Sequence, residues 1–158
     1  MPFSPDVVVT SEDTTRMLLI VEAKLSSRDR LRDESELKSY MLHMRCPIGL
    51  FVTPEEIVVF RDSYTDHSEQ SVRRVGAFPA PKNWIVFKAG ASSKNTDLAL
   101  RFEENVKSWL EGLRSSPSDS AKEFSKETRE ALVDYVIPAL SEGTVRSGGP
   151  REVRLESR

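Results

Sequence analysis

The first part of the chain alternates between apolar and polar stretches with the lengths typical of strands and turns. Val7-Val8-Val9 and the run at residues 16–24, "RMLLIVEAK", are rich in β-branched and aliphatic side chains, and "SEDTTR" between them is typical of a turn. The second run is almost continuously apolar, as in a strand covered on both faces. We therefore predict two strands within residues 5–25.

The next stretch changes to the period of a helix. In residues 34–45, "ESELKSYMLHMR", the apolar side chains recur on one helical face, namely Leu37, Tyr40, Met41 and Met44. Pro47 disfavours helical geometry at Cys46, so the helix should end there. Two apolar runs, 48–52 and 57–60, then flank Thr53-Pro54-Glu55-Glu56 and predict a hairpin, and residues 72–78 predict a further short strand.

The C-terminal part predicts two amphipathic helices followed by a tail. Apolar side chains recur at helical spacing in two sets, Leu98, Phe102, Val106, Trp109 and Leu113, and then Phe124, Leu132, Val136 and Leu140. Ser120 and Glu123 form a possible capping box for the second helix, and Pro138 should kink or end it. From Gly143 onward the chain is mostly Gly, Ser and charged residues, which predicts disorder.

Composition narrows the classes of protein that fit these elements. With 158 residues, 38% hydrophobic and 30% charged, the chain suits one domain with a modest core. A formal net charge of −2 gives no bulk attraction to nucleic acid, although a local basic cleft remains compatible with it. The single cysteine excludes an internal disulfide and a cysteine-based metal site. Without an apolar span or a signal peptide, we expect a cytoplasmic protein with no membrane partner.

Charged residues beside the first two strands suggest metal chemistry. Asp6 precedes the first strand, and Glu22 and Lys24 end the second, where residues two apart point to the same face. If Asp6 lies on the neighbouring strand, two carboxylates converge and repel each other, and a hard cation such as Mg²⁺ (or Mn²⁺) relieves that repulsion. Lys24 would then orient or activate a water molecule, and the cation would neutralise charge on a scissile phosphate.

The residues Pro5-Asp6 and Glu22-Ala23-Lys24 resemble the motif of the PD-(D/E)xK nuclease superfamily. The order strand, strand, helix, hairpin is most similar to the nuclease domain at the N-terminus of type I restriction enzyme R subunits. The resemblance implies an α/β (α+β), restriction-endonuclease-like fold: a mixed central sheet flanked by helices, with a helical C-terminal extension. On this basis residues 1–90 form an N-terminally trimmed nuclease-like core, residues 91–142 a helical extension packing on the core or a partner, and residues 143–158 a disordered tail.

The resemblance also implies a function and a set of site residues. The expected activity is metal-dependent hydrolysis of DNA phosphodiester bonds, related to restriction or repair. Asp6 and Glu22 would bind the metal together with the backbone carbonyl of Ala23, and Lys24 would act on the water. DNA is the expected partner, with a homodimer or a partner subunit also compatible with the sequence. No phosphate-binding loop of the G-x-x-x-x-G-K-[ST] type is present, so ATP is not expected.

Several features of the sequence depart from the family pattern or leave other interpretations open. Relatives usually carry a helix, often with a Glu, and a strand before the Pro-Asp pair, whereas this chain starts four residues ahead of Pro5. Glu36 stands where relatives often have a Gln, four residues before Tyr40; both are accessory candidates, or else a surface and a packing residue. The candidates for DNA-backbone contacts, some of them on a loop before the helix, are Arg28, Arg30, Arg32, Arg73 and Arg74.

Two alternatives to a nuclease remain. One is a catalytically inactive protein of the same fold that serves as a binding or assembly module. The other is an unrelated α+β interaction protein, for which Asp6 and Glu22 should lie more than about 8 Å apart, beyond the reach of one small cation.

Overall fold

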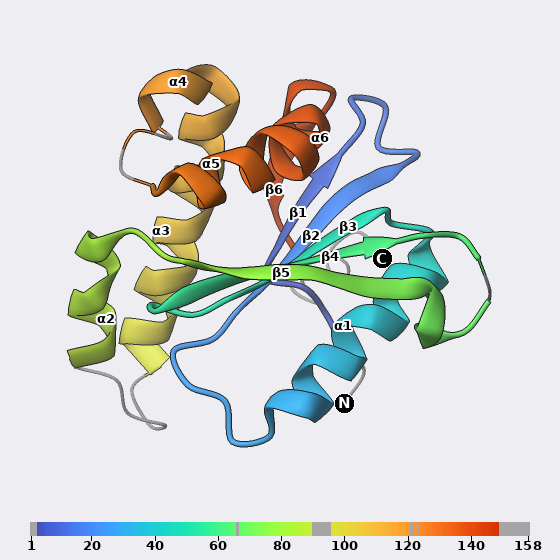
Figure 1. The fold of residues 1–158 in the computed structure, drawn as a ribbon, viewed down its shortest axis with the longest axis horizontal. Coiled ribbons are helices and arrows are strands. Elements are labelled where there is room, and N and C mark those ends of the chain that lie inside the picture. Colours follow the sequence, from blue (N-terminus) through green and yellow to red (C-terminus); the bar gives the residue numbers. More distant parts are fainter. Residues whose placement is uncertain (1–2, 66, 90–95, 121, 123, 149–158) are drawn as a thin grey trace, which may run out of the picture.

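The computed structural model describes residues 3–65, 67–89, 96–120, 122 and 124–148. Within them the chain forms a six-stranded open sheet in the order β5-β4-β3-β2-β1-β6, flanked by helices (Figure 1). The strands are β1 (Val7–Thr10), β2 (Met17–Ala23), β3 (Ile48–Val52), β4 (Glu56–Asp62), β5 (Val72–Pro79) and β6 (Thr144–Ser147). The predicted mixed α and β architecture is therefore confirmed.

The sheet is mixed because one pair of neighbouring strands, β2 and β3, runs parallel. β1 and β2 pair antiparallel, as do β3 with β4 and β4 with β5, which confirms the predicted hairpin of β3 and β4 and the other predicted strands. β2 and β3 run parallel and are joined by helix α1 (Arg30–Met44), so they form a β-α-β unit. The carboxyl ends of β2 and β3 thus open at the same edge of the sheet, beside the start of α1.

Helices cover both faces of the sheet, with α1 on one of them (Figure 1). The opposite face carries α2 (Ile85–Ala89), α3 (Thr96–Ser115), α4 (Pro117–Ser120), α5 (Lys126–Ala131) and α6 (Ile137–Ser141). Alternation along β1 and β2 separates two cores: Val8 and Ile20 pack with Leu37 and Met41 of α1, whereas Val7, Val9 and Val21 pack against the other helices, Phe102 among their residues. We call the first side of the sheet the α1 face.

Helix α1 begins earlier than the apolar pattern predicts. It starts at Arg30 rather than at residue 34, because the Asp29 carboxylate caps it by accepting from the backbone N–H of Arg32. Arg30 and Arg32 therefore lie in the first turn and not on a preceding loop, which corrects that expectation. Leu37 and Met41 are buried as predicted, whereas Met44 is 38% exposed.

The last predicted helix is interrupted. Its hydrogen bonding becomes π-helical at Leu132–Val136, between α5 and α6, just before Pro138. Proline has no N–H to donate to the carbonyl one turn earlier, so a distortion at this place is expected, as predicted. The predicted capping box is wrong: Ser120 ends α4, and the Ser125 hydroxyl accepts instead from the N–H of Thr128. Glu123 lies outside the described residues.

The expected disordered tail is wrong over its first part. Residues Thr144–Ser147 form β6, which pairs antiparallel with β1 and buries Val145. Gly143 permits the approach, since a Cβ there would lie 2.7 Å from the carbonyl oxygen of Thr10. Residues 149–158 of the expected tail lie outside the described residues. Among the helices of the described residues, none has the length and apolar character needed to cross a membrane.

Candidate functional site

Asp6 and the end of β2 lie side by side. Asp6 immediately precedes β1, and the antiparallel pairing of Val7 with Val21 brings it next to the backbone of Ala23. The Ala23 N–H donates to Asp6 Oδ2 at 2.7 Å, and the Asp6 N–H donates to the carbonyl of Val21 at 2.8 Å. The carboxylate of Asp6 is therefore held at the end of β2 by the strand pairing itself.

Glu22 and Lys24 project to the same face, as their spacing predicts. Lys24 Nζ lies 3.6 Å from Glu22 Oε2, with the Glu22 side chain 10% exposed and that of Lys24 39% exposed. Ala23 points the other way, into the core beneath α3. We call Asp6, Glu22, Lys24 and the backbone of Ala23 the carboxylate site.

The electrostatics of the carboxylate site favour a bound proton. Burial, together with the charge and hydrogen bond of Asp6, raises the pKa of Glu22 to about 9 despite the opposing effect of Lys24. With this raised pKa, Glu22 keeps its proton at neutral pH and is hydrogen-bonded to Asp6. The alternative in which Asp6 and Glu22 lie far apart is not compatible with this contact.

The donor types at the carboxylate site suit a hard cation. Asp6 and Glu22 offer carboxylate oxygens, and Mg²⁺ is commonly held by one or two carboxylates together with water and substrate oxygens. Over the described residues, the structure has no group of three or more His, Cys, Asp or Glu side chains placed to hold a metal ion. Asp6 and Glu22 would leave the remaining ligand positions of such a cation to water and substrate oxygens.

C-terminal elements cover the other side of Asp6. The N–H of Gly148, after β6, donates to the carbonyl of Asp6 at 2.9 Å. Asp6 also lines a pocket of about 270 Å³ with residues from α3 and β6, namely Glu103, Glu104, Lys107 and Ser147. Lys107 Nζ reaches Ser147 Oγ at 3.1 Å across it. No spacing in the sequence signals this contact, because β6 meets β1 only through the tertiary fold.

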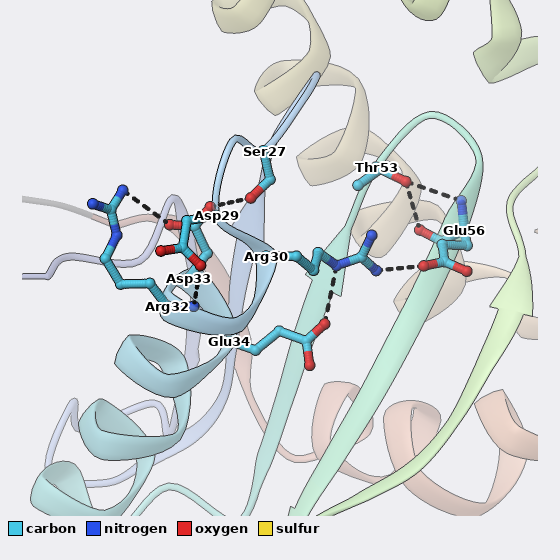
Figure 2. Close-up of polar contacts among 8 residues, drawn as sticks. All are labelled: Ser27, Asp29, Arg30, Arg32, Asp33, Glu34, Thr53 and Glu56. Carbon is cyan, nitrogen blue, oxygen red and sulfur yellow. Dashed lines mark hydrogen bonds and ion pairs between the residues drawn. The ribbon is translucent and has the colours of Figure 1, made fainter.

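Next to the carboxylate site, three charged residues tie α1 to the β3–β4 hairpin (Figure 2). Arg30 Nε donates to Glu34 Oε2 at 3.0 Å, and Arg30 also pairs with Glu56. The guanidinium carbon of Arg30 lies 4.7 Å from the centre of the Phe51 ring, and Phe51 pairs with Glu22 in the parallel register. We call Arg30, Glu34 and Glu56 the arginine cluster. The sequence did not predict that Arg30 pairs with two acids.

The start of α1 carries a second set of polar contacts (Figure 2). The Ser27 hydroxyl donates to the buried carboxylate of Asp33, and Arg32 lies 3.8 Å from the same residue. Arg32 therefore has an acidic neighbour, whereas Arg28 is exposed on the loop before the helix. Of the predicted arginines in this region, only Arg28 keeps the expected loop position.

A pocket opens beyond Lys24. It has a volume of about 600 Å³ and lies between the loop after β2 and the β3–β4 hairpin. We call it the loop pocket. It is lined by Leu25, Ser26, Ser27 and Arg30 on one side and by Thr53, Glu55 and Glu56 on the other.

The remaining predicted residues lie elsewhere. Glu36 and Tyr40 line a groove on the outside of α1, separate from the pocket of Asp6, and the Tyr40 ring packs on Phe3 with 5.2 Å between centroids. The strand register through Glu22 reaches β5 at Ala77, whereas Arg73 lies four residues further along that edge strand. At about 3.3 Å per residue, and with two strands between, Arg73 and Arg74 do not reach the carboxylate site.

Comparison with known proteins gives no relative from which a role could be transferred. No family model matches the chain, and neither a curated protein nor a solved structure matches it.

Proposed function

We propose that the chain is a nuclease of restriction-endonuclease-like fold that hydrolyses DNA phosphodiester bonds with Mg²⁺ or Mn²⁺. The observation that carries the proposal is the meeting of Asp6 and Glu22 from adjacent strands, with Lys24 Nζ 3.6 Å from Glu22. Two acids and a lysine converge here although burial disfavours the charged form of Glu22. Perturbed carboxyl groups of this kind concentrate at functional sites.

Each residue has a distinct task in this proposal. The carboxylates of Asp6 and Glu22 and the carbonyl of Ala23 would hold the cation, and Glu22 would first give up the proton that it shares with Asp6. A cation bound there would stabilise charge on the scissile phosphate as a Lewis acid. Lys24, with a half-exposed side chain, would orient the attacking water from the solvent side.

The C-terminal elements support the fold part of the proposal. The nuclease family pattern expects a helix and a strand before the Pro-Asp pair. In this chain β6 pairs antiparallel with the outer edge of β1, and α3 packs on the face opposite α1. Elements from the end of the sequence therefore occupy the positions beside Asp6 at which a preceding strand and helix would be expected.

The raised pKa of Glu22 also fits an inactive binding or assembly module. Glu22 holds a proton at neutral pH, and a carboxyl group that stays protonated is a poor cation ligand. The two functions differ in their response to metal, because a cation that binds only the folded state raises the melting temperature. An inactive module would show no such shift.

Cleavage assays test the proposal directly. Linear, circular and single-stranded DNA would be incubated with Mg²⁺ and with Mn²⁺, using the wild type, Lys24→Ala and the control Lys126→Ala, which changes an exposed lysine on α5. We expect cleavage by the wild type and the control and its loss in Lys24→Ala. Equal cleavage by all three would assign the activity elsewhere, and no cleavage together with no metal-induced melting shift would favour the binding module.

A further inference from the structure

The loop pocket lies where a sheet of this kind receives ligands. β2 and β3 are the parallel pair, and the Lys24 N–H still donates to the carbonyl of Val52 at 2.9 Å before the chains diverge. The pocket begins with the next residue, Leu25. In open α/β sheets, ligands bind outside the carboxyl ends of the strands, and about 600 Å³ falls in the range of small-molecule sites.

Arg30 gives the loop pocket a flat and rigid wall. Its guanidinium is held by Glu34 at 3.0 Å and by Glu56, and it lies 4.7 Å from the centre of the Phe51 ring. Because two carboxylates already compensate its charge, Arg30 is a poor ligand for a phosphate. Its planar surface remains suited to stacking, since nucleic-acid bases stack on arginine planes as they do on aromatic rings.

The charge of the loop pocket also argues against a phosphate backbone. Glu55 and Glu56 outnumber Arg30 among the charged residues of its lining. The other polar groups are the hydroxyls of Ser26, Ser27 and Thr53, and the Thr53 hydroxyl already accepts from the N–H of Glu56 at 3.1 Å. A neutral group with polar edges therefore fits this pocket better than an anion does.

Two of the arginines expected to bind a DNA backbone lie far from Lys24. Arg73 and Arg74 lie on the far part of β5, and the whole chain carries a formal net charge of −2. A nuclease that follows the backbones of a duplex depends on several cations around the cleavage site. One base drawn out of a single strand needs only a pocket and a stacking surface.

We infer that the loop pocket takes one unstacked base of single-stranded DNA, stacked on the guanidinium of Arg30, while the adjoining phosphate lies at Lys24. The inference rests on the proposed nuclease function and names its substrate form. A base in this position would place its own sugar-phosphate next to the carboxylate site, because the loop pocket starts one residue after Lys24. Duplex DNA would have to unpair before it could enter.

Binding measurements test the pocket without depending on catalysis. A fluorescent single-stranded oligodeoxycytidylate of about ten nucleotides and a blunt duplex would be titrated into the wild-type protein in EDTA, which withholds the metal needed for cleavage and keeps Lys24 in place. Two changes would be made to this protein: Ser26→Trp, which fills the pocket from an exposed loop position, and Arg30→Lys, which keeps the charge but removes the plane. The matched control is Arg101→Lys, on an exposed arginine of α3.

We expect single strands to bind more tightly than the duplex, and each pocket variant to weaken that binding about tenfold, the effect of losing one stacked base. Arg101→Lys should leave binding unchanged. Ser26→Trp remains informative if Arg30→Lys lowers the melting temperature, because Ser26 is exposed and outside the arginine cluster.

Cleavage by the same proteins in Mg²⁺ or Mn²⁺ separates the two claims. Equal cleavage of single strands and duplex, unaffected by Ser26→Trp, would overturn the base pocket and leave the nuclease. Pocket-dependent binding of single strands, with no cleavage in Mg²⁺ or Mn²⁺, would overturn the nuclease and leave the base pocket.

Discussion

Two buried glutamates on the same face of the sheet have opposite surroundings. As whole residues, Glu22 and Glu34 are each 8% exposed. Phe51 connects their surroundings, because it pairs with Glu22 in the sheet and lies under Arg30, which binds Glu34. Glu34 accepts from the Arg30 guanidinium at 3.0 Å, with Glu56 as a second acid on the same cation. Glu22 lies 3.6 Å from the Lys24 ammonium group and is hydrogen-bonded to a second carboxyl group, that of Asp6.

The comparison shows that equal burial can serve stability in one place and chemistry in another. The arginine cluster joins α1 to the β3–β4 hairpin with a planar cation that satisfies both carboxylates, which is the arrangement of a structural ion pair. In the carboxylate site the neighbouring acid helps burial to raise the pKa of Glu22 to about 9, so the site is more stable with a proton or another cation than without one. Each cluster has two acids and one cation: Arg30 contacts both of its acids, whereas Glu22 lies 3.6 Å from Lys24 and is hydrogen-bonded to the second acid, Asp6.

Removing the cation from the arginine cluster should have the largest effect on stability. Arg30→Ala leaves Glu34 buried without its partner, and we expect the free energy of unfolding to fall by about 2 kcal/mol, less than for a fully buried pair because the Arg30 side chain is 36% exposed. Denaturant unfolding measures the change. Arg101→Ala, which removes an exposed pair with Asp97, should cost less than about 0.5 kcal/mol. Similar decreases in both variants would show that the cluster is no more than a surface pair.

Adding a cation to the carboxylate site should have the next largest effect. Mg²⁺ or Mn²⁺ that binds only the folded protein raises its stability by about 1.4 kcal/mol at a tenfold excess over Kd. Because the cation must displace the proton of Glu22, whose pKa is about 9, the rise in melting temperature should be larger at pH 8.5 than at pH 6. Thermal unfolding with and without metal measures it. A shift that persists in Glu22→Ala would place the cation elsewhere.

Replacing Glu22 with its neutral isostere should have a smaller effect, of opposite sign to that of Arg30→Ala. The raised pKa means that, between pH 4.5 and about 9, the folded state binds a proton that the unfolded state has released, so wild-type stability falls as pH rises through this range. Gln does not titrate, so Glu22→Gln should be more stable than the wild type at pH 7 by about 1 kcal/mol or more. The two proteins should converge near pH 4, where both states of the wild type are protonated. Parallel pH profiles of unfolding would contradict the raised pKa.

Local patterns in the sequence predict the parts of this molecule that form between near neighbours. Strand alternation and helical spacing locate β1 to β5, α1 and α3, and the turn between β1 and β2 is short enough to bring Asp6 to Glu22. Lys24 follows at a spacing that strand geometry fixes. The carboxylate site is therefore predictable because its residues share one hairpin.

The parts that the sequence does not predict depend on distant contacts. β6 is four residues long and mostly polar, and it is a strand because β1 offers it a free edge, with Arg146 donating to the Thr10 hydroxyl across 136 residues of sequence. Arg30 resembles any solvated arginine until the β3–β4 hairpin places Glu56 beside it. Similarly, the sequence places Arg73 and Arg74 at the start of β5, but it does not show that this end of the strand lies away from the carboxylate site.

The smallest expected effect is that of replacing Arg73 and Arg74, which lie away from the carboxylate site. Arg73 and Arg74 are exposed on the edge strand, several residues along it from the register of Glu22, so the double change to Ala should alter stability by less than about 0.5 kcal/mol and leave cleavage of single-stranded DNA unchanged. Cleavage rates at low and moderate salt measure this, because removing any cation that binds a phosphate of the substrate reduces the salt dependence. A marked fall in activity at low salt would show that DNA extends from Lys24 across β4 to β5. The substrate path would then follow the sheet edge as well as the loop pocket.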